Sequence, residues 1–174
     1  MRRKKGLEGY IRNIPNFPKP GILFRDITTL LKDKKAFQQA VDKLAQKYKN
    51  KKIDLVAAVE ARGFILGGAI AHRLGAGFVP VRKKGKLPAK TNSVTYELEY
   101  GTDTLEMHHD AIKSGDRVLI VDDLLATGGT VSAVTNLVKQ AKGKIIGIAF
   151  LIELTDLKGI NKLKDYPVYS LIKY

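Results

Sequence analysis

Two adjacent carboxylates, Asp122 and Asp123, have the residue types and surroundings of a sugar-phosphate site. They follow an apolar run, Val118–Val121, which is rich in β-branched residues and typical of a strand buried on both faces of a parallel sheet. The small-residue turn that comes next and leads into a helical pattern consists of Ala126, Thr127, Gly128, Gly129 and Thr130. Glycines let an anion approach the backbone, and a helix N-terminus supplies amide donors and a positive dipole. Because carboxylates accept hydrogen bonds from sugar hydroxyls or help to hold a metal ion, the stretch predicts a site for a ribose phosphate.

This turn differs from two other phosphate-binding loops. A P-loop has Lys followed by Ser or Thr after its last glycine, whereas Gly129 is followed directly by Thr130. A dinucleotide-binding loop has three spaced glycines without acids in front of them. The competing interpretation is an ordinary strand with surface acids and a glycine-rich turn, but strand, acids, turn and helix stand in the order that phosphate binding needs. The stretch resembles the signature of the type I phosphoribosyltransferases, which implies that it holds the phosphoribosyl end of phosphoribosyl pyrophosphate.

The composition favours a single globular domain over residues 1–174. The chain contains no cysteine, which excludes disulfides, thiolate metal sites and a thiol nucleophile. No apolar run is long enough to cross a bilayer, so we expect a cytoplasmic protein without a membrane partner. The net charge of +14 comes largely from scattered lysines, as in 47–52 and 158–164, where a solvated surface is favoured. We therefore expect no nucleic-acid partner.

Strand patterns alternate with helical patterns along most of the chain. Asp33 is a candidate N-cap for a helix that continues to Tyr48, and Gly75 is a stop signal for a second helix, Phe64–Leu74. The predicted strands are Ile53–Val59, Phe78–Val81, Val118–Val121, Ile145–Ile152 and an edge strand over Val168–Ile172. This alternation predicts an α/β fold with a mostly parallel sheet flanked by helices.

Two segments depart from the alternation. Residues 1–29 form a predicted N-terminal hood, in which Asn13–Gly21 is too rich in proline for regular structure and too apolar for a free linker. Residues 82–108 begin with a dense basic run, and the pattern that follows indicates a β-hairpin with arms at Ser93–Tyr100 and Thr104–His108. We expect this hairpin to be a flap inserted between two strands of the sheet.

Polar residues follow several of the predicted strands. Ligands of parallel α/β sheets bind beyond the carboxyl ends of the strands. This rule should bring together 60–63, 82–86, 122–130 and 153–155. Arg62 can make a bidentate contact with phosphate, although a surface ion pair with Glu60 is the competing interpretation. The basic run can likewise be solvated charge rather than a binding surface.

Six segments in a fixed order extend the resemblance over nearly the whole chain. They are FPKPGILFRDIT, EARGF, RKKGKLP, LEYG, VDDLLATGGT and ELTDLKG. Together they resemble the adenine-specific branch of the type I phosphoribosyltransferases. The resemblance implies transfer of phosphoribose from phosphoribosyl pyrophosphate to adenine by a homodimer, with Mg2+ held mainly through the substrate and Asp122 and Asp123 as candidate ligands. The alternatives are a phosphoribosyltransferase for another base, or a nucleotide-sensing regulator that binds nucleic acid on the same fold.

The resemblance also implies roles for single residues. The adenine-binding candidates are Leu23, Phe24, Arg25 and Leu154. The pyrophosphate-binding candidates are Arg62, Arg82, Lys83 and Lys86. The catalytic candidates are Arg62 and the flap residues Glu99 and Tyr100. Glu99 either is the general acid/base that handles the purine proton or fixes the flap by hydrogen bonding, and the sequence leaves both open.

The remaining conspicuous side chains are expected to have no chemical role. His108 and His109 are adjacent, and neighbouring residues of a strand point to opposite faces, so they cannot easily share a metal ion. We expect them at an interface or on the surface. The tyrosines other than Tyr100 are expected to serve packing.

Overall fold

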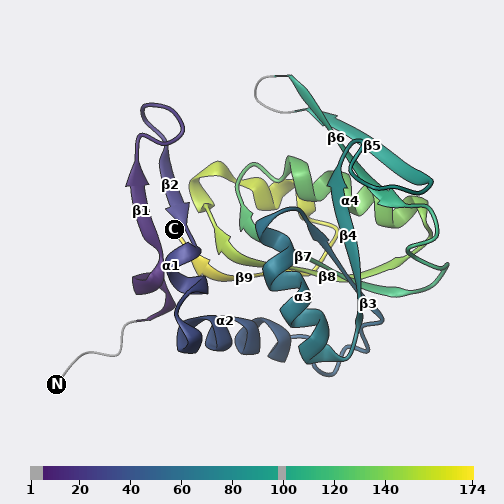
Figure 1. Ribbon diagram of the computed structural model, residues 1–174, viewed down its shortest axis with the longest axis horizontal. Helices are drawn as coiled ribbons and strands as arrows, with labels where there is room; N and C mark the ends of the chain where they lie inside the picture. The colour runs from purple at the N-terminus through teal and green to yellow at the C-terminus, as the bar shows by residue number, and fades with distance from the viewer. Residues whose placement is uncertain (1–5, 98–100) are drawn as a thin grey trace.

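The computed structural model describes residues 6–97 and 101–174, and within these residues seven strands form one sheet in the order β5-β6-β4-β3-β7-β8-β9 (Figure 1). Strands β4, β3, β7, β8 and β9 pair in parallel, and β5 and β6 form an antiparallel hairpin at the β4 edge. The strands are β3 (Leu55–Val59), β4 (Gly77–Lys83), β5 (Thr91–Glu97), β6 (Thr102–His108), β7 (Arg117–Leu125), β8 (Lys144–Glu153) and β9 (Val168–Lys173). The predicted fold class is confirmed, including the hairpin inserted between β4 and β7 along the chain.

Helices cover both faces of the sheet. The helices are α1 (Thr28–Leu31), α2 (Lys34–Gln46), α3 (Arg62–Leu74) and α4 (Gly129–Gln140), with short 3-10 turns η1 (Leu7–Tyr10), η2 (Thr155–Leu157) and η3 (Gly159–Leu163). Apolar side chains of α2 and α3 share one buried cluster with Leu119 and Val121 of β7, whereas those of α4 share a second cluster with Val118 and Ile120. All four of these β7 residues are fully buried, so the prediction of a strand covered on both faces is confirmed.

The predicted helix signals act as expected at two places. The side chain of Asp33 accepts hydrogen bonds from the backbone N–H groups of Lys35 and Ala36, and thereby caps α2. Gly75 ends α3 in the left-handed conformation, with φ of +66°. These local signals fix the ends of the two helices that pack on the same face of the sheet.

Strand β7 is longer than predicted. Its pairing with β8 continues through Asp122 opposite Phe150 to Leu125 opposite Glu153. The expectation that the strand ends at Val121 is therefore wrong, because backbone pairing with β8 holds the two acidic residues inside the sheet. Their carboxylates are positioned by a strand rather than by a loop.

The N-terminal hood contains a two-stranded antiparallel ribbon of β1 (Arg12–Pro15) and β2 (Leu23–Asp26). The expectation that Asn13–Gly21 lacks regular structure is wrong for its first three residues. Proline is tolerated there because Pro15 stands at the end of an isolated ribbon that has no further strand to bond. In Figure 1 the ribbon stands beside the C-terminal end of the chain, and the guanidinium carbon of Arg25 lies 3.7 Å from the ring centroid of Tyr174. This contact ties β2 to the last residue of the chain.

Candidate active site

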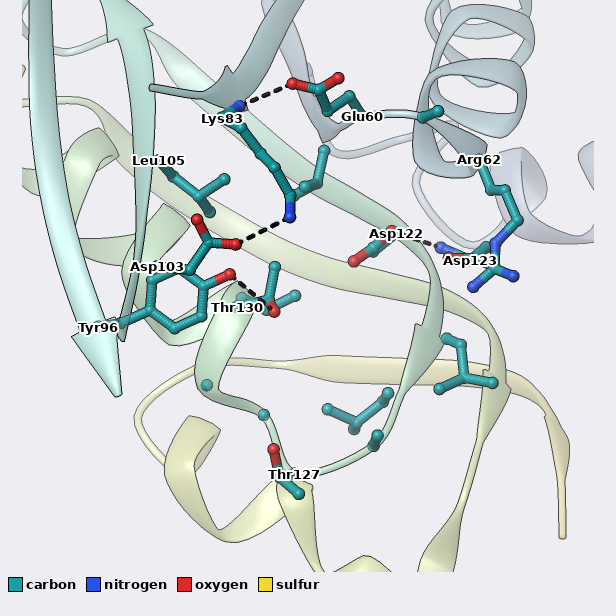
Figure 2. Close-up of a pocket in the computed structure, with 18 residues that line it drawn as sticks. Glu60, Arg62, Lys83, Tyr96, Asp103, Leu105, Asp122, Asp123, Thr127 and Thr130 are labelled. Carbon is teal, nitrogen blue, oxygen red and sulfur yellow. Dashed lines mark hydrogen bonds and ion pairs between the residues drawn. The ribbon is translucent and has the colours of Figure 1, made fainter. Parts of the chain in front are cut away.

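A pocket of about 600 Å³ opens at the carboxyl ends of β3, β4 and β7 (Figure 2). Its walls come from the start of α3, from the β5–β6 hairpin and from the turn before α4. The lining residues with polar side chains are Glu60, Arg62, Lys83, Tyr96, Asp103, Asp122, Asp123, Thr127 and Thr130. Three of the four segments expected to meet thus do so. The fourth, 153–155, does not line the pocket, but the N–H of Leu154 donates at 2.9 Å to the carbonyl oxygen of Leu125, which does line it.

Asp122 and Asp123 carry buried carboxylates at the floor of this pocket. Burial raises the pKa of Asp122 well above its usual value, the charge of Asp123 adds to the rise, and the charge of Arg62 lowers the pKa too little to offset both effects. Burial also raises the pKa of Asp123, although the Arg62 guanidinium opposes this rise from 2.7 Å away. Ionisation of the pair therefore has a cost that a ligand with hydroxyl groups or positive charge would reduce.

Arg62 contacts Asp123 rather than Glu60, so the surface pair considered from the sequence is wrong. The reason is that α3 begins at Arg62 and packs its first turn against the end of β7. The next residue, Gly63, allows this approach, since a Cβ there would lie 2.8 Å from an Asp122 carboxylate oxygen. Gly63, the glycine of the EARGF segment, is thus explained by its close contact with Asp122.

The turn before α4 is held by a second close approach of glycines. Gly128 has φ of +79°, and a Cβ on it would lie 2.5 Å from the carbonyl oxygen of Gly159, at the start of η3. A Cβ on Gly159 would in turn meet the carbonyl oxygen of Ala126 and lie 2.9 Å from the amide nitrogen of Gly128. Gly159 belongs to the ELTDLKG segment, but sequence reasoning gave it no role, because a contact between segments thirty residues apart leaves no local signal.

The four predicted pyrophosphate cations divide into two groups. Arg62 and Lys83 line the pocket. Arg82 and Lys86 do not line it, and both bond to Glu60, at 3.3 and 3.0 Å. Burial alone would raise the pKa of Glu60, but the backbone N–H of Lys83, which donates at 2.7 Å, and the two cations lower it. Glu60 is therefore ionised and holds Arg82, Lys83 and Lys86 in place, a role that the sequence did not predict.

Two pocket residues on the hairpin were also missed. The Asp103 carboxylate lies 3.0 Å from the ammonium of Lys83. The Tyr96 hydroxyl is 3.5 Å from the hydroxyl of Thr130 at the start of α4, and burial raises the pKa of this phenol. The expectation that Tyr96 serves packing alone is incomplete, since its polar end reaches the pocket. The hairpin register places Tyr96 opposite Asp103, a residue that the predicted second arm, Thr104–His108, did not include.

The predicted adenine-binding residues lie beside the pocket rather than among the residues that line it. The ring of Phe24 packs edge-on against Phe17 at 5.1 Å, and its centroid lies 5.2 Å from the guanidinium carbon of Arg62. Leu23 is 45% exposed, and Leu154 is a partly buried residue against the core. Arg25 donates to the side-chain oxygen of Asn13 at 2.6 Å. The contact of Phe24 with Arg62 brings the hood to the edge of the pocket.

Comparison with known proteins identifies this arrangement. The family model described as a phosphoribosyl transferase domain matches residues 28–173. The chain belongs to the phosphoribosyltransferase family. Within this family it is similar to the adenine phosphoribosyltransferase of Clostridium kluyveri, at 62% identity over 97% of this chain and 98% of the relative, and to that of Brachyspira hyodysenteriae, at 58% over 97% and 99%.

Solved phosphoribosyltransferase structures agree with the fold described above. The adenine phosphoribosyltransferase of Thermoanaerobacter pseudethanolicus superposes with a TM-score of 0.94 at 57% identity, covering 97% of this chain and 98% of that one. The enzyme of Saccharomyces cerevisiae, solved with adenine and an imino-altritol bisphosphate, gives a TM-score of 0.90 at 42% identity over 95% and 96%. The family predicted from residues 122–130 and from the six segments is confirmed.

The other residues singled out from the sequence lie outside the pocket or outside the described residues. Glu99 and Tyr100 lie outside the described residues, so their roles stay predictions. His108 ends β6 partly buried, and the Nδ1 atom of the exposed His109 lies 2.9 Å from the side-chain oxygen of Asn92; neither lines the pocket. In the part of the chain that the structure describes, no helix has the length and apolarity required to span a bilayer.

Proposed function

We propose that this phosphoribosyltransferase transfers the phosphoribosyl group of phosphoribosyl pyrophosphate to adenine, giving AMP and pyrophosphate. The observation that carries the proposal is the pocket in which the buried Asp122 and Asp123 adjoin the glycine turn at the start of α4. The adenine specificity is supported by relatives named adenine phosphoribosyltransferase at 58 to 62% identity over almost their full length. It is also supported by the hood, which places Phe24 against Arg62.

The reaction forms a bond between a purine nitrogen and the anomeric carbon while the bond from that carbon to the pyrophosphate oxygen breaks. Positive charge develops on the ribose and negative charge on the leaving pyrophosphate. Asp122 and Asp123 accept hydrogen bonds from the ribose hydroxyls, and the backbone amides of the turn over 126–130 bind the 5′-phosphate. Arg62 and Lys83, which face the pocket, stabilise the negative charge on the leaving group.

The base is proposed to bind between the hood and the pocket. Leu23 and Arg25 read the edge of adenine, and Phe24 and Leu154 flank its faces. Phe24 is positioned for this by its ring contacts with Phe17 and with the Arg62 guanidinium. The purine proton leaves as the new bond forms, and Glu99 with Tyr100 on the flap is the proposed group that handles it.

Mg2+ fits the donors that the chain offers. Among residues 6–97 and 101–174, no group of three or more His, Cys, Asp or Glu side chains is arranged to hold a metal ion alone. Two adjacent buried carboxylates with raised pKa values do reach the pocket. Mg2+ is commonly bound by one or two carboxylates together with substrate phosphates, so Asp122 and Asp123 would hold it jointly with phosphoribosyl pyrophosphate. When bound, the ion supplies further stabilisation of the leaving pyrophosphate.

The test of the function is an assay of the purified protein with phosphoribosyl pyrophosphate, Mg2+ and each candidate base in turn. AMP formed from adenine, with stoichiometric pyrophosphate, supports the proposal. Nucleotide formed from hypoxanthine, guanine, xanthine or orotate but not from adenine would move the protein to another specificity. Binding of duplex DNA at nanomolar concentration without any nucleotide product would instead indicate a regulator.

Removal of divalent cations is expected to stop AMP formation. Excess chelator should lower the rate at least a hundredfold, because the pocket's own cations, Arg62 and Lys83, already have carboxylate partners. The rate is measured before and after chelation and again after Mg2+ is restored. A rate that does not change in chelator would remove Mg2+ from the mechanism.

Glu99→Gln is expected to lower kcat more than tenfold while changing the KM for phosphoribosyl pyrophosphate less than threefold, because an amide cannot take up the purine proton. Steady-state kinetics with both substrates measure the two effects. Glu97→Gln is the matched control, since it removes the same charge from an exposed position of the same arm. A kcat unchanged in Glu99→Gln would make Glu99 a loop anchor.

A cytoplasmic homodimer is proposed on the same family resemblance. Two large apolar side chains, Ile65 of α3 and Phe78 of β4, are 46% and 38% exposed on neighbouring elements. Phe78 packs edge-on against Phe64 of α3 at 5.5 Å, so these exposed apolar side chains stand on two elements in contact, and exposed apolar side chains are common at subunit interfaces. Sedimentation at micromolar concentration tests the assembly, and a monomer there would contradict it.

A further inference from the structure

The pocket contains more negative than positive side chains, although its proposed ligand is an anion. Among the described residues that line it, Arg62 and Lys83 are the cations, whereas Glu60, Asp103, Asp122 and Asp123 are carboxylates. Both cations are paired, Arg62 with Asp123 at 2.7 Å and Lys83 with Asp103 at 3.0 Å. Within the described part of the pocket, the cations that pyrophosphate would contact thus already have an internal partner.

The two ion pairs differ in what they leave available. The pair of Arg62 with Asp123 runs through Nε, and a guanidinium carries further N–H donors on its other nitrogens for a phosphate. Lys83 has a single ammonium, so Asp103 and a phosphate oxygen would share one small charge. Figure 2 shows the Lys83–Asp103 pair on the side of the pocket away from Arg62, at the hairpin.

Both partners of this pair are charged at neutral pH. The hydrogen bond and the charge of Asp103 raise the pKa of Lys83. Burial by itself would raise the pKa of Asp103, but the hydrogen bond from Lys83 lowers it. The Lys83 side chain is 59% exposed and that of Asp103 is 23% exposed, so a ligand can reach the ammonium without unfolding the hairpin.

The hairpin has other anchors besides this pair. Tyr96 lies opposite Asp103 in the hairpin register, its hydroxyl lies near Thr130, and its ring lies 3.6 Å from the place of a Cβ on Gly129. The other carboxylate oxygen of Asp103 accepts the backbone N–H of Thr104 at 2.8 Å, a bond that an asparagine oxygen preserves. The charge of Asp103 can thus be removed while the hairpin stays in place.

We propose that Asp103 is an internal competitor of pyrophosphate for the Lys83 ammonium. The inference rests on the proposed function. The carboxylate neutralises Lys83 when no pyrophosphate is bound, weakens the binding of every ligand that carries a pyrophosphate group, and takes Lys83 back as the product leaves. Asp103 therefore sets the affinity of the leaving-group side of the pocket without contacting the ribose or the base.

The test is the binding of inorganic pyrophosphate with Mg2+ to Asp103→Asn, measured by titration calorimetry, together with the two KM values. We expect the Kd of pyrophosphate and the KM of phosphoribosyl pyrophosphate to fall about tenfold, and the KM of adenine to stay within twofold. Asp110→Asn, which removes a charge from an exposed position after β6, is the control and should leave the Kd unchanged. Unchanged or weaker pyrophosphate binding in Asp103→Asn would overturn the inference, since the pair would then position Lys83 or do nothing.

The same substitution in a Lys83→Met variant separates competition for Lys83 from simple electrostatic repulsion of pyrophosphate by the Asp103 carboxylate. In Lys83→Met, adding Asp103→Asn should change the Kd of pyrophosphate less than threefold, because the contested ammonium is gone. An equal gain in both backgrounds would overturn the competition. Failure of the proposed function looks different, because the wild-type protein would then form no AMP from adenine, whatever the effect of Asp103→Asn on pyrophosphate binding.

Discussion

Replacing Asp122 with asparagine is expected to lower kcat/KM on the order of a hundredfold while making the folded protein more stable at neutral pH. Activity falls because the amide can no longer offer a charged acceptor to the ribose or a ligand to Mg2+, and hydrogen bonds to charged groups contribute about 1.5–3 kcal/mol each. Stability rises because ionising the buried Asp122 carboxylate costs free energy at neutral pH, a cost that the neutral amide avoids. The asparagine oxygen can still accept the backbone N–H of Asp123, which donates to the aspartate at 2.8 Å.

The stability gain of Asp122→Asn should depend on pH in one direction. Since the pKa of Asp122 is higher in the folded protein than its ordinary value of 3.8, the folded state holds the proton more tightly than the unfolded chain. Wild-type stability therefore falls as pH rises from that ordinary value through the raised one, whereas the variant avoids this loss. The difference in melting temperature is expected to be small near pH 4 and to reach about 3 °C or more at neutral pH, since about 1 kcal/mol moves a chain of this size by roughly 2–4 °C.

Asp123→Asn is the matched comparison for that experiment. Burial raises the pKa of Asp123 as well, but Arg62 opposes the rise, and removing the carboxylate leaves Arg62 without its ion-pair partner. Thermal melts from pH 4 to pH 8 should show a smaller gain for Asp123→Asn than for Asp122→Asn. Equal gains, or a loss of stability in Asp122→Asn at neutral pH, would contradict the assignment of Asp122 as the carboxylate ionised at a cost.

Local sequence signals predicted the framework of the fold. The β-branched run Val118–Val121, the cap at Asp33 and the stop at Gly75 each act through residues close in the chain, so their outcomes follow from pattern alone. The end of β7 did not follow, because pairing with β8 carries the strand through Asp122 to Leu125. The ribbon in Asn13–Gly21 was missed for a related reason, since it depends on a partner strand at Leu23–Asp26.

The part of the site that consists of one continuous stretch of residues could be predicted. The ion pairs between distant residues could not. The acids and the glycine turn were identified from residue type and order, and they line the pocket together. Which carboxylate meets which cation was not, because Arg62 had a nearer candidate in Glu60 along the chain than its actual partner Asp123. The sheet brings together charged residues that are far apart in the chain. Neither the Lys83–Asp103 pair nor the Arg82–Glu60 pair therefore has a local signature in the sequence.

Gly159→Ala is expected to raise the KM for phosphoribosyl pyrophosphate at least tenfold, although Gly159 itself is assigned no substrate contact. A methyl group at Gly159 would meet the carbonyl oxygen of Ala126 and lie 2.9 Å from the amide nitrogen of Gly128, so the turn that binds the phosphate must shift. Backbone atoms on both sides of the contact leave no flexible side chain to give way. Because the turn's amides are proposed to bind the 5′-phosphate, the loss should appear mainly in this KM rather than in that of adenine.

Gly68→Ala separates this effect from a general cost of losing glycine. Gly68 lies inside α3, where a Cβ would have no heavy atom within 4 Å, so alanine should leave both KM values unchanged and raise stability by about 0.5–1 kcal/mol. Kinetics and thermal melts of the two variants give the comparison. If Gly159→Ala kept the wild-type KM for phosphoribosyl pyrophosphate, the turn would have to reach its binding geometry without support from η3. A selective rise in that KM would instead show that the phosphate site of this protein is built from two distant segments, because the backbone amides of 126–130 are the donors and Gly159 leaves the space in which that turn fits.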